Sequence, residues 1–175
     1  MGYDELSSIR FIIPAAPVAK ARPRTVTMRN GRVRTYTPAK TNEYEKLGRF
    51  HAQQAMKKHK IMLQAVRMVC RLEVPIPKSW SKKKRKEAAS GNLRPITRPD
   101  VDNYVKAILD CCNGVCFKDD SQVVELVVTK VYSHEPKATI QLMEIPHANQ
   151  ITDPQDCGEL SSADWAAAFR LHSRL

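Results

Sequence analysis

The sequence RPDVDNYVKAILDCCNG at residues 98–114 decides how the chain is expected to fold. From Val101 to Cys112, apolar residues recur at i, i+3, i+4, i+7, i+8 and i+11, which is the spacing of a helix that packs one face on a core. A glycine two residues later is a typical helix stop. The pattern predicts an amphipathic helix that carries Asp100 and Asp102 at its start.

Runs of β-branched and aromatic residues predict strands on both sides of this helix. Asn30-Gly31, between two arms that carry Thr and Val, also predicts a tight hairpin turn. A short polar turn joins the last two strands, so the simplest expectation pairs them directly as an antiparallel hairpin. The four main strands are expected at residues 8–13, 66–74, 122–132 and 138–145.

Two further helices are expected before residue 98. Thr37 is a candidate N-cap, followed by a proline at the first helical position, for a helix that continues to about Lys60. Ser79 or Ser81 is the candidate N-cap of a short helix through residues 82–89.

These elements predict an α+β fold with a mixed, largely antiparallel sheet covered by helices. Residues 1–146 are expected to form the folded domain, and residues 147–175 a C-terminal extension with a short helix. A chain of 175 residues can bury a core without disulfides. Its five cysteines lack the paired spacing of a zinc site, so reduced thiols in a cytoplasmic protein are expected.

The charge balance indicates a polyanionic partner. Lys and Arg outnumber Asp and Glu by 29 to 18, giving a net charge of +11, and each phosphate neutralised on a nucleic acid would add counterion release to the affinity. A membrane partner is not expected, because the basic residues do not face a wide apolar stripe and no apolar run is long enough to span a bilayer.

Four carboxylates are expected to surround the helix of residues 101–112. Asp100 and Asp102 open it, Asp119 and Asp120 lie in the turn beyond, and the short connection between them is expected to let all four face one place. Hard cations such as Mg²⁺ bind carboxylate oxygens, and a bound ion would activate water and stabilise charge on a scissile phosphate. The structural alternative is that these aspartates only cap helices and turns.

The basic residues have the same two interpretations. Lys106, one turn after Asp102 and one turn before Asp110, is either part of an ion-pair ladder or a fixed cation beside the metal. Lysines on a helix are usually a solvated surface, whereas arginines spread among Pro, Gly and Thr suit a segment laid along phosphates. The candidate DNA-binding residues are Lys20, Arg22, Arg24, Arg29, Arg32, Arg34, Lys82, Lys83, Lys84, Arg85 and Lys86.

Three motifs identify a family. They are RPDVDNYVKAILD at residues 98–110, NG at 113–114 and KDDSQVVE at 118–125, and together they resemble the signature of the RusA-like Holliday junction resolvases, endodeoxyribonucleases of bacteria, phages and prophages. The resemblance covers about residues 8–145, and the central motif is long enough to be specific. Supporting similarity lies in PVAKARPR at 17–24, TYTPAKT at 35–41 and PKSWSK at 77–82.

The resemblance implies a role for each acidic residue. Asp100, Asp102 and Asp120 would be the catalytic, metal-binding aspartates, Asp119 an accessory acid and Lys106 the catalytic-site lysine. It also implies Mg²⁺ as the metal, with Mn²⁺ as a substitute, and no small-molecule cofactor. The expected enzyme is a homodimer that cuts four-way junctions and other branched DNA in recombination, repair or phage DNA processing. A two-fold dimer presents two identical sites to a junction of similar symmetry.

The resemblance further implies a location in the bacterial cytoplasm, associated with the nucleoid. Two features depart from the family pattern, namely the extension after Pro146 and the presence of Ala21 where glycine is frequent.

A rival hypothesis is a non-catalytic nucleic-acid-binding protein, which would bind in a salt-sensitive manner and be indifferent to chelator. A metal-bound nucleotide-sugar site is disfavoured, because no alternating strand-helix pattern accompanies the DxD.

Overall fold

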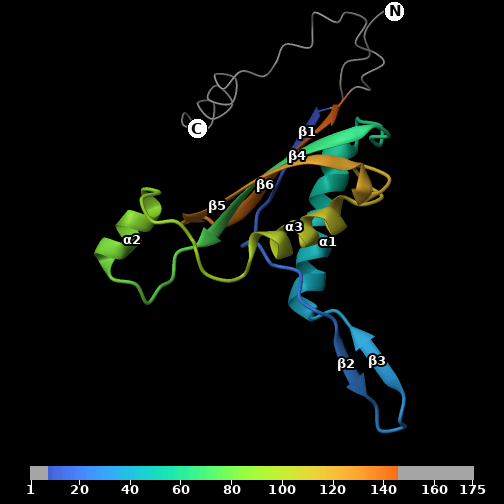
Figure 1. Cartoon of the computed structure of the whole chain (residues 1–175), viewed down its shortest axis with the longest axis horizontal. Coiled ribbons are helices and arrows are strands. Elements are labelled where there is room, and N and C mark those ends of the chain that lie inside the picture. The colour runs from blue at the N-terminus through green and yellow to red at the C-terminus, as the bar shows by residue number, and fades with distance from the viewer. Residues whose placement is uncertain (1–7, 146–175) are drawn as a thin grey trace, which may run out of the picture. The chain divides into compact units, whose positions relative to one another are not determined.

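The protein is described by a computed structural model that places residues 8–145, so the predicted C-terminal extension and its helix lie outside the described residues. The predicted α+β class is confirmed, with three α-helices and a four-stranded mixed sheet (Figure 1). In chain order the elements are β1 Ser8–Ile13, β2 Arg24–Thr27, β3 Val33–Tyr36, α1 Ala39–Met56, β4 Ala65–Pro75, α2 Lys82–Ala89, α3 Val101–Cys112, the short 3-10 helix η1 Asp120–Gln122, β5 Val123–Ser133 and β6 Lys137–Ile145.

The sheet has the strand order β1-β6-β4-β5. β6 is antiparallel to both β1 and β4, whereas β4 and β5 are parallel. β4 is the best-buried strand, because every second residue from Val66 to Val74 faces the core. β5 lies at an edge and pairs only with β4 within the described part of the chain.

The predicted direct pairing of the last two strands is wrong, because β4 lies between β5 and β6. The connection of His134, Glu135 and Pro136 spans the roughly 9.6 Å between strands that are two positions apart. A three-residue loop can therefore join neighbours or next-neighbours. An alternating pattern of buried residues shows which face of a strand is covered but not which strand it pairs with. Here β4, in which every second side chain is buried along its length, lies between β5 and β6, whereas the first half of β5 is exposed.

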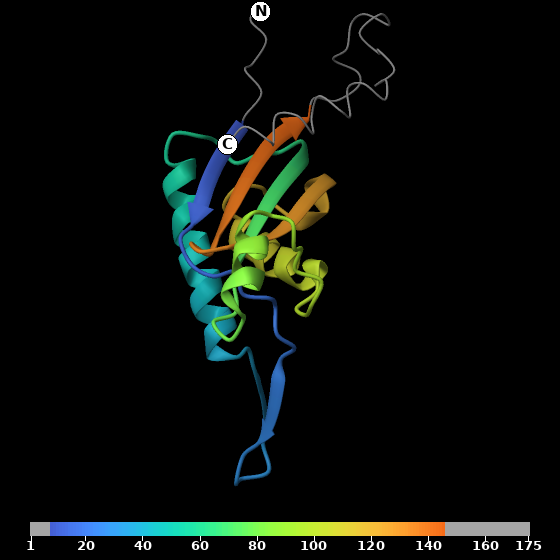
Figure 2. The same cartoon turned by 90° about the vertical axis from the view of Figure 1, so that its left-hand side faces the viewer.

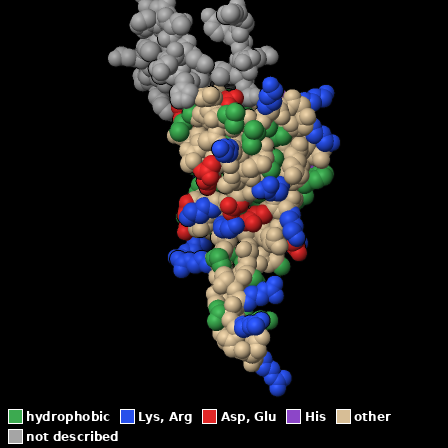
Figure 3. Space-filling view, turned by 90° about the vertical axis from the view of Figure 1, so that its right-hand side faces the viewer, with side chains coloured by type: hydrophobic (Ala, Val, Ile, Leu, Met, Phe, Trp, Pro, Cys, Tyr) green, Lys and Arg blue, Asp and Glu red, His purple; other side chains and the backbone are tan. Residues whose placement is uncertain are grey.

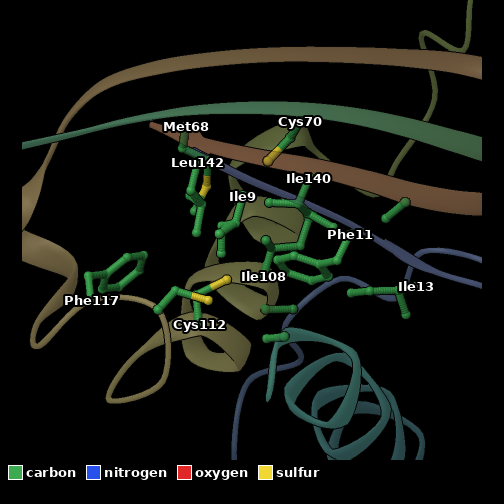
Figure 4. Close-up of a cluster of buried hydrophobic side chains, with 14 of the residues drawn as sticks. Ile9, Phe11, Ile13, Met68, Cys70, Ile108, Cys112, Phe117, Ile140 and Leu142 are labelled. Carbon is green, nitrogen blue, oxygen red and sulfur yellow. The ribbon is translucent and has the colours of Figure 1, made fainter. Parts of the chain in front are cut away.

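Helices α1 and α3 lie on the same side of the sheet and pack on each other (Figures 1 and 2). Ile108 and Cys112 of α3 point toward the sheet and are fully buried there (Figure 4). α2 lies beyond the C-terminal ends of β4 and β5, where Trp80 packs edge to face on Tyr132 at 5.1 Å between ring centroids. The core between the sheet and the two helices includes Ile9, Phe11, Ile13, Met68, Cys70, Phe117, Ile140 and Leu142.

The predicted boundaries of α2 and α3 hold, whereas α1 ends at Met56, four residues before its predicted end at about Lys60. α3 begins and ends where the apolar spacing predicted, and Gly114 has the positive φ of a helix stop. Ser81 caps α2, its side chain accepting from the Lys84 amide. α1 begins one residue later than predicted, with Pro38 at the N-cap position and no side-chain cap.

The predicted turn at Asn30-Gly31 is confirmed in a separate two-stranded hairpin of β2 and β3. Gly31 has φ +75, a conformation that L side chains rarely adopt, and the Asn30 side chain accepts from the Arg32 amide. Both strands are exposed, so the hairpin projects away from the core (Figure 1).

Gly48 sets how closely α1 approaches α3. A Cβ at this position would lie 2.4 Å from Cys111 Sγ and 3.0 Å from Ile13 Cδ1. We expect Gly48→Ala to lower the free energy of unfolding by about 1 to 2 kcal/mol, because overpacking outweighs the gain in helix propensity. Thermal or urea unfolding measures the change. Adding Cys111→Ala removes the sulfur and should restore part of the loss, whereas a more stable Gly48→Ala single variant would contradict this packing.

Candidate active site

The first acidic pair lies at the start of α3. Asp100 is the N-cap residue, but its side chain makes no capping hydrogen bond. Asp102 is in the first turn and accepts from Lys106 Nζ at 3.2 Å and from the Asn103 side chain at 3.3 Å. Capping therefore does not account for the Asp100 carboxylate, and the Lys106 cation is already held beside Asp102.

Lys130 of β5 fixes the segment that leads into this pair. Its Nζ donates to the carbonyl oxygens of Thr97 and Pro99, each at 3.1 Å. Lys130 is level with Leu72 in the parallel ladder and faces the side of the sheet that carries the helices. The end of β5 and the backbone before Asp100 are thus tied together.

The second acidic pair lies before β5. Asp119 caps η1, accepting from the Ser121 amide at 3.0 Å, and hydrogen bonds from Ser121 hold the pKa of the Asp119 carboxyl below its ordinary value. The Gln122 side chain binds the carbonyls of Met62 and Gln64, which anchors this turn at the start of β4. Asp120 is exposed and has no side-chain partner among residues 8–145, so it is the acid of this pair that is available to a ligand.

The described residues of a single chain do not gather the four carboxylates into one metal site. α3 has 12 residues, so it separates its two ends by about 18 Å. Asp100 and Asp102 lie at one end, and the turn with Asp119 and Asp120 follows the other. Within the described range, no group of three or more His, Cys, Asp or Glu side chains could hold a metal ion. The short connection after α3 returns the chain to the sheet, not to the helix start.

Lys20 is a structural cation. Its Nζ lies 2.6 Å from Glu45 Oε1 of α1 and 2.6 Å from Asp110 Oδ2 of α3. Burial acts to lower the pKa of Lys20, but the hydrogen bonds and charges of Asp110 and Glu45 outweigh burial and raise it. The Lys20 amide also donates to the carbonyl of Asn103 at 2.7 Å. The base of the hairpin arm is therefore clamped to both helices, and Asp110 pairs with Lys20 rather than with Lys106.

The other predicted DNA-binding residues lie on two surfaces. Arg24 begins β2, and Arg22, Arg29, Arg32 and Arg34 are exposed along the hairpin. Figure 3 shows Lys and Arg side chains along this arm, with Asp and Glu side chains among basic ones near its base. On α2, Lys82, Lys83, Lys84 and Lys86 are exposed and Arg85 is half-buried.

One lysine of α2 is held in a defined position. Lys84 Nζ lies 4.1 Å from the centre of the Trp80 ring, which is the geometry of a cation–π contact. Trp80 in turn packs on Tyr132 of β5. The lysine-rich surface is therefore joined to the same strand that carries Lys130.

The cysteines are not candidate nucleophiles. Cys70, Cys111, Cys112 and Cys116 are free and buried. Burial raises the pKa of Cys70 to about 12, and burial together with Glu45 and Asp110 raises that of Cys111 to about 12. Cys157 lies outside the described residues.

Sequence reasoning missed Lys130 and Gln122. Lys130 is the one lysine in a valine-rich strand, and its inward-facing position was a signal of a specific partner. Gln122 was placed at the start of a strand, where its side-chain contacts with the backbone before β4 have no local signal.

No helix among the described residues is long and apolar enough to cross a bilayer.

Two comparisons with known proteins bear on the site. A family model described as Endodeoxyribonuclease RusA matches residues 14–143, a range that contains both acidic pairs and both basic surfaces. A Bacillus subtilis (strain 168) protein named "Uncharacterized protein YqaN" is 42% identical over 142 residues, which are 80% of this chain and 99% of that protein.

Removing the Lys130 ammonium should loosen the segment before Asp100. We expect Lys130→Met to raise the rate of thermolysin cleavage on the amino side of Ile96 by about tenfold, because two hydrogen bonds from a charged donor are lost and the segment opens more often. Mass spectrometry of the fragments measures the rate. Lys58→Met, at an exposed position after α1, is the control and should leave cleavage at Ile96 unchanged. An unaltered rate in Lys130→Met would show that the segment is held without Lys130.

Proposed function

The chain belongs to the RusA endodeoxyribonuclease family, and on this premise we propose that it is a Mg²⁺-dependent nuclease that resolves four-way junctions and related branched DNA as a homodimer. The observation that carries the proposal is that Asp100, at the start of α3, and Asp120, in η1, are exposed and have no side-chain partner among residues 8–145. In the bacterial cytoplasm, such an enzyme would act in recombination, repair or phage DNA processing.

The exposed edge of β5 supports the dimer. Val124, Leu126 and Val127 are 63%, 47% and 41% exposed, and they lie in a long strand whose outer edge pairs with no other strand of residues 8–145. Leu126 and Val127 point to opposite faces of the sheet, so both faces are apolar at this edge. A long apolar edge strand is a site for pairing with another strand, and a second copy offers an identical one.

A two-fold pairing of β5 with its symmetry mate would also complete the acid site. In an antiparallel pair centred near Leu126, the start of one β5 lies opposite the end of the other. Lys130 ties that end to the backbone before Asp100. Asp120 of one chain would then face Asp100 and Asp102 of the other, and these three carboxylates are the residues we propose as metal ligands.

The donor set suits Mg²⁺. This ion is usually held by one or two carboxylates together with waters and substrate phosphate, and Mn²⁺ accepts the same oxygen ligands. When bound, the ion would supply activation of water and neutralisation of charge on the phosphate. Lys106, held 3.2 Å from Asp102, would contribute a fixed positive charge beside the scissile group.

The two basic surfaces would bind the arms of the junction. The hairpin is joined to the start of α3 by the hydrogen bond from the Lys20 amide to the Asn103 carbonyl. The connection of residues 91–99 joins α2 to the same end of α3. Phosphates held by the hairpin arginines and the α2 lysines would therefore flank the acids. Lys20 itself is committed to Glu45 and Asp110, so we assign its role to the scaffold.

Cutting should depend on both acids and on the metal. With a labelled four-way junction and Mg²⁺, the protein is expected to make symmetric nicks, and chelator should abolish nicking while leaving salt-sensitive binding. Asp100→Asn, Asp102→Asn or Asp120→Asn should each lower the rate by about a thousandfold. Glu135→Gln is the matched control, because it removes an exposed carboxylate in the connection between β5 and β6, outside the proposed site. Full cutting by the three variants would remove the proposed site.

Mixed dimers test whether the site is shared. Equal amounts of Asp100→Asn and Asp120→Asn chains, unfolded and refolded together, should regain about a quarter of the wild-type sites, because half of the dimers then hold one intact site. Mixing Asp100→Asn with Asp102→Asn should regain nothing, since both changes fall on the same side of each site. Equal recovery in the two mixtures, or none in either, would contradict a shared site.

A further inference from the structure

Ile96 is the most exposed large apolar side chain of the described residues, at 91%. It lies in the irregular connection between α2 and α3, which Figure 1 shows as an open segment. Arg94 and Arg98, on either side of it, are exposed as well. A single exposed isoleucine is ordinary on a protein surface, so its significance depends on how it is held and what lies beside it.

The backbone on both sides of Ile96 is held. Toward α2, the Leu93 amide donates to the carbonyl of Glu87 at 3.1 Å and the Pro95 side chain is buried. Toward α3, Lys130 binds the carbonyls of Thr97 and Pro99. Ile96 is therefore presented on an ordered support, and little conformational entropy remains to be lost when it contacts a partner.

The surroundings of Ile96 indicate DNA rather than protein. Ile96 precedes Asp100 by four residues, so it lies within about 14 Å of Asp100, a distance of about four stacked bases. The flanking arginines favour a polyanion, and the bases are the apolar part of that ligand. Aliphatic side chains inserted between base steps unstack them, and unstacking is easiest where pairing is already interrupted.

We propose that Ile96 is a wedge that inserts beside the bases at the branch point and so makes recognition selective for branched DNA. This inference rests on the proposed function, because it assigns the substrate discrimination of the same site. Arg94 and Arg98 hold the phosphates on either side of the wedge. A continuous duplex would have to be unstacked at full cost, whereas a branch point offers a step that is already weakened.

The test uses Ile96→Ser and Ile96→Leu in an Asp100→Asn background, so that bound DNA stays intact. A four-way junction carries 2-aminopurine next to the branch point, and its fluorescence rises when the base unstacks. The Ile96→Ser change should suppress this rise and lower the affinity for the junction about tenfold, with little change for duplex. Ile96→Leu should retain both properties. Phe50→Ser, at an exposed position of α1, is the control for loss of surface apolar area.

The outcomes separate this proposal from the nuclease assignment. Equal fluorescence and equal junction-to-duplex affinity ratios for Ile96→Ser and its parent would overturn the wedge, even if the wild-type chain cuts junctions with Mg²⁺. Absence of cutting by the wild-type chain, with normal unstacking and selectivity, would instead overturn the nuclease assignment and keep the wedge. A parent protein that fails to raise the fluorescence would also overturn the wedge.

Discussion

The rigid packing of α3 against the sheet and α1 is the constraint on which the rest of the structure depends. Ala107, Ile108, Cys111 and Cys112 are fully buried, so the helix can neither shorten nor tilt without opening the core. Asp100 and Asp102 lie at its start, about 18 Å along the helix from its other end, and Asp119 and Asp120 follow that end in the turn before β5. Within residues 8–145, no group of three or more candidate ligands could hold a metal ion, which is why the proposed metal site is one that two chains would share.

The positive charge of the chain serves two separate purposes. Lys20 and Lys130 are used inside the fold, where one joins α1 to α3 and the other orders the backbone before Asp100. The hairpin arginines and the α2 lysines are left to face a polyanion. A positive net charge indicates that a polyanion is a suitable ligand. Whether a given Lys or Arg can reach that ligand depends on whether its side chain is already bonded within the fold.

Local patterns were sufficient to predict the elements and insufficient to predict their assembly. The apolar spacing gave α3 from Val101 to Cys112, and the Asn-Gly turn gave the β2–β3 hairpin, because both signals lie within a few residues. The position of β4 between β5 and β6 depends on contacts between distant segments. The family motif singles out the acids, whose roles stay a prediction, and the spacing of a motif carries no information about whether one chain or two would complete a site.

The symmetry of β5 pairing bears on the shape of a suitable substrate. A two-fold axis perpendicular to the sheet keeps the helices of both chains on one face, so both acid sites would open on the same side of an eight-stranded sheet. They would lie beyond opposite ends of the shared ladder, so their separation would exceed the roughly 24 Å length of a seven-residue overlap. A linear duplex has no reason to offer two equivalent strands at that separation with a two-fold axis between them. A four-way junction does, so the geometry that denies each chain a complete site would also match the pair of sites to branched DNA.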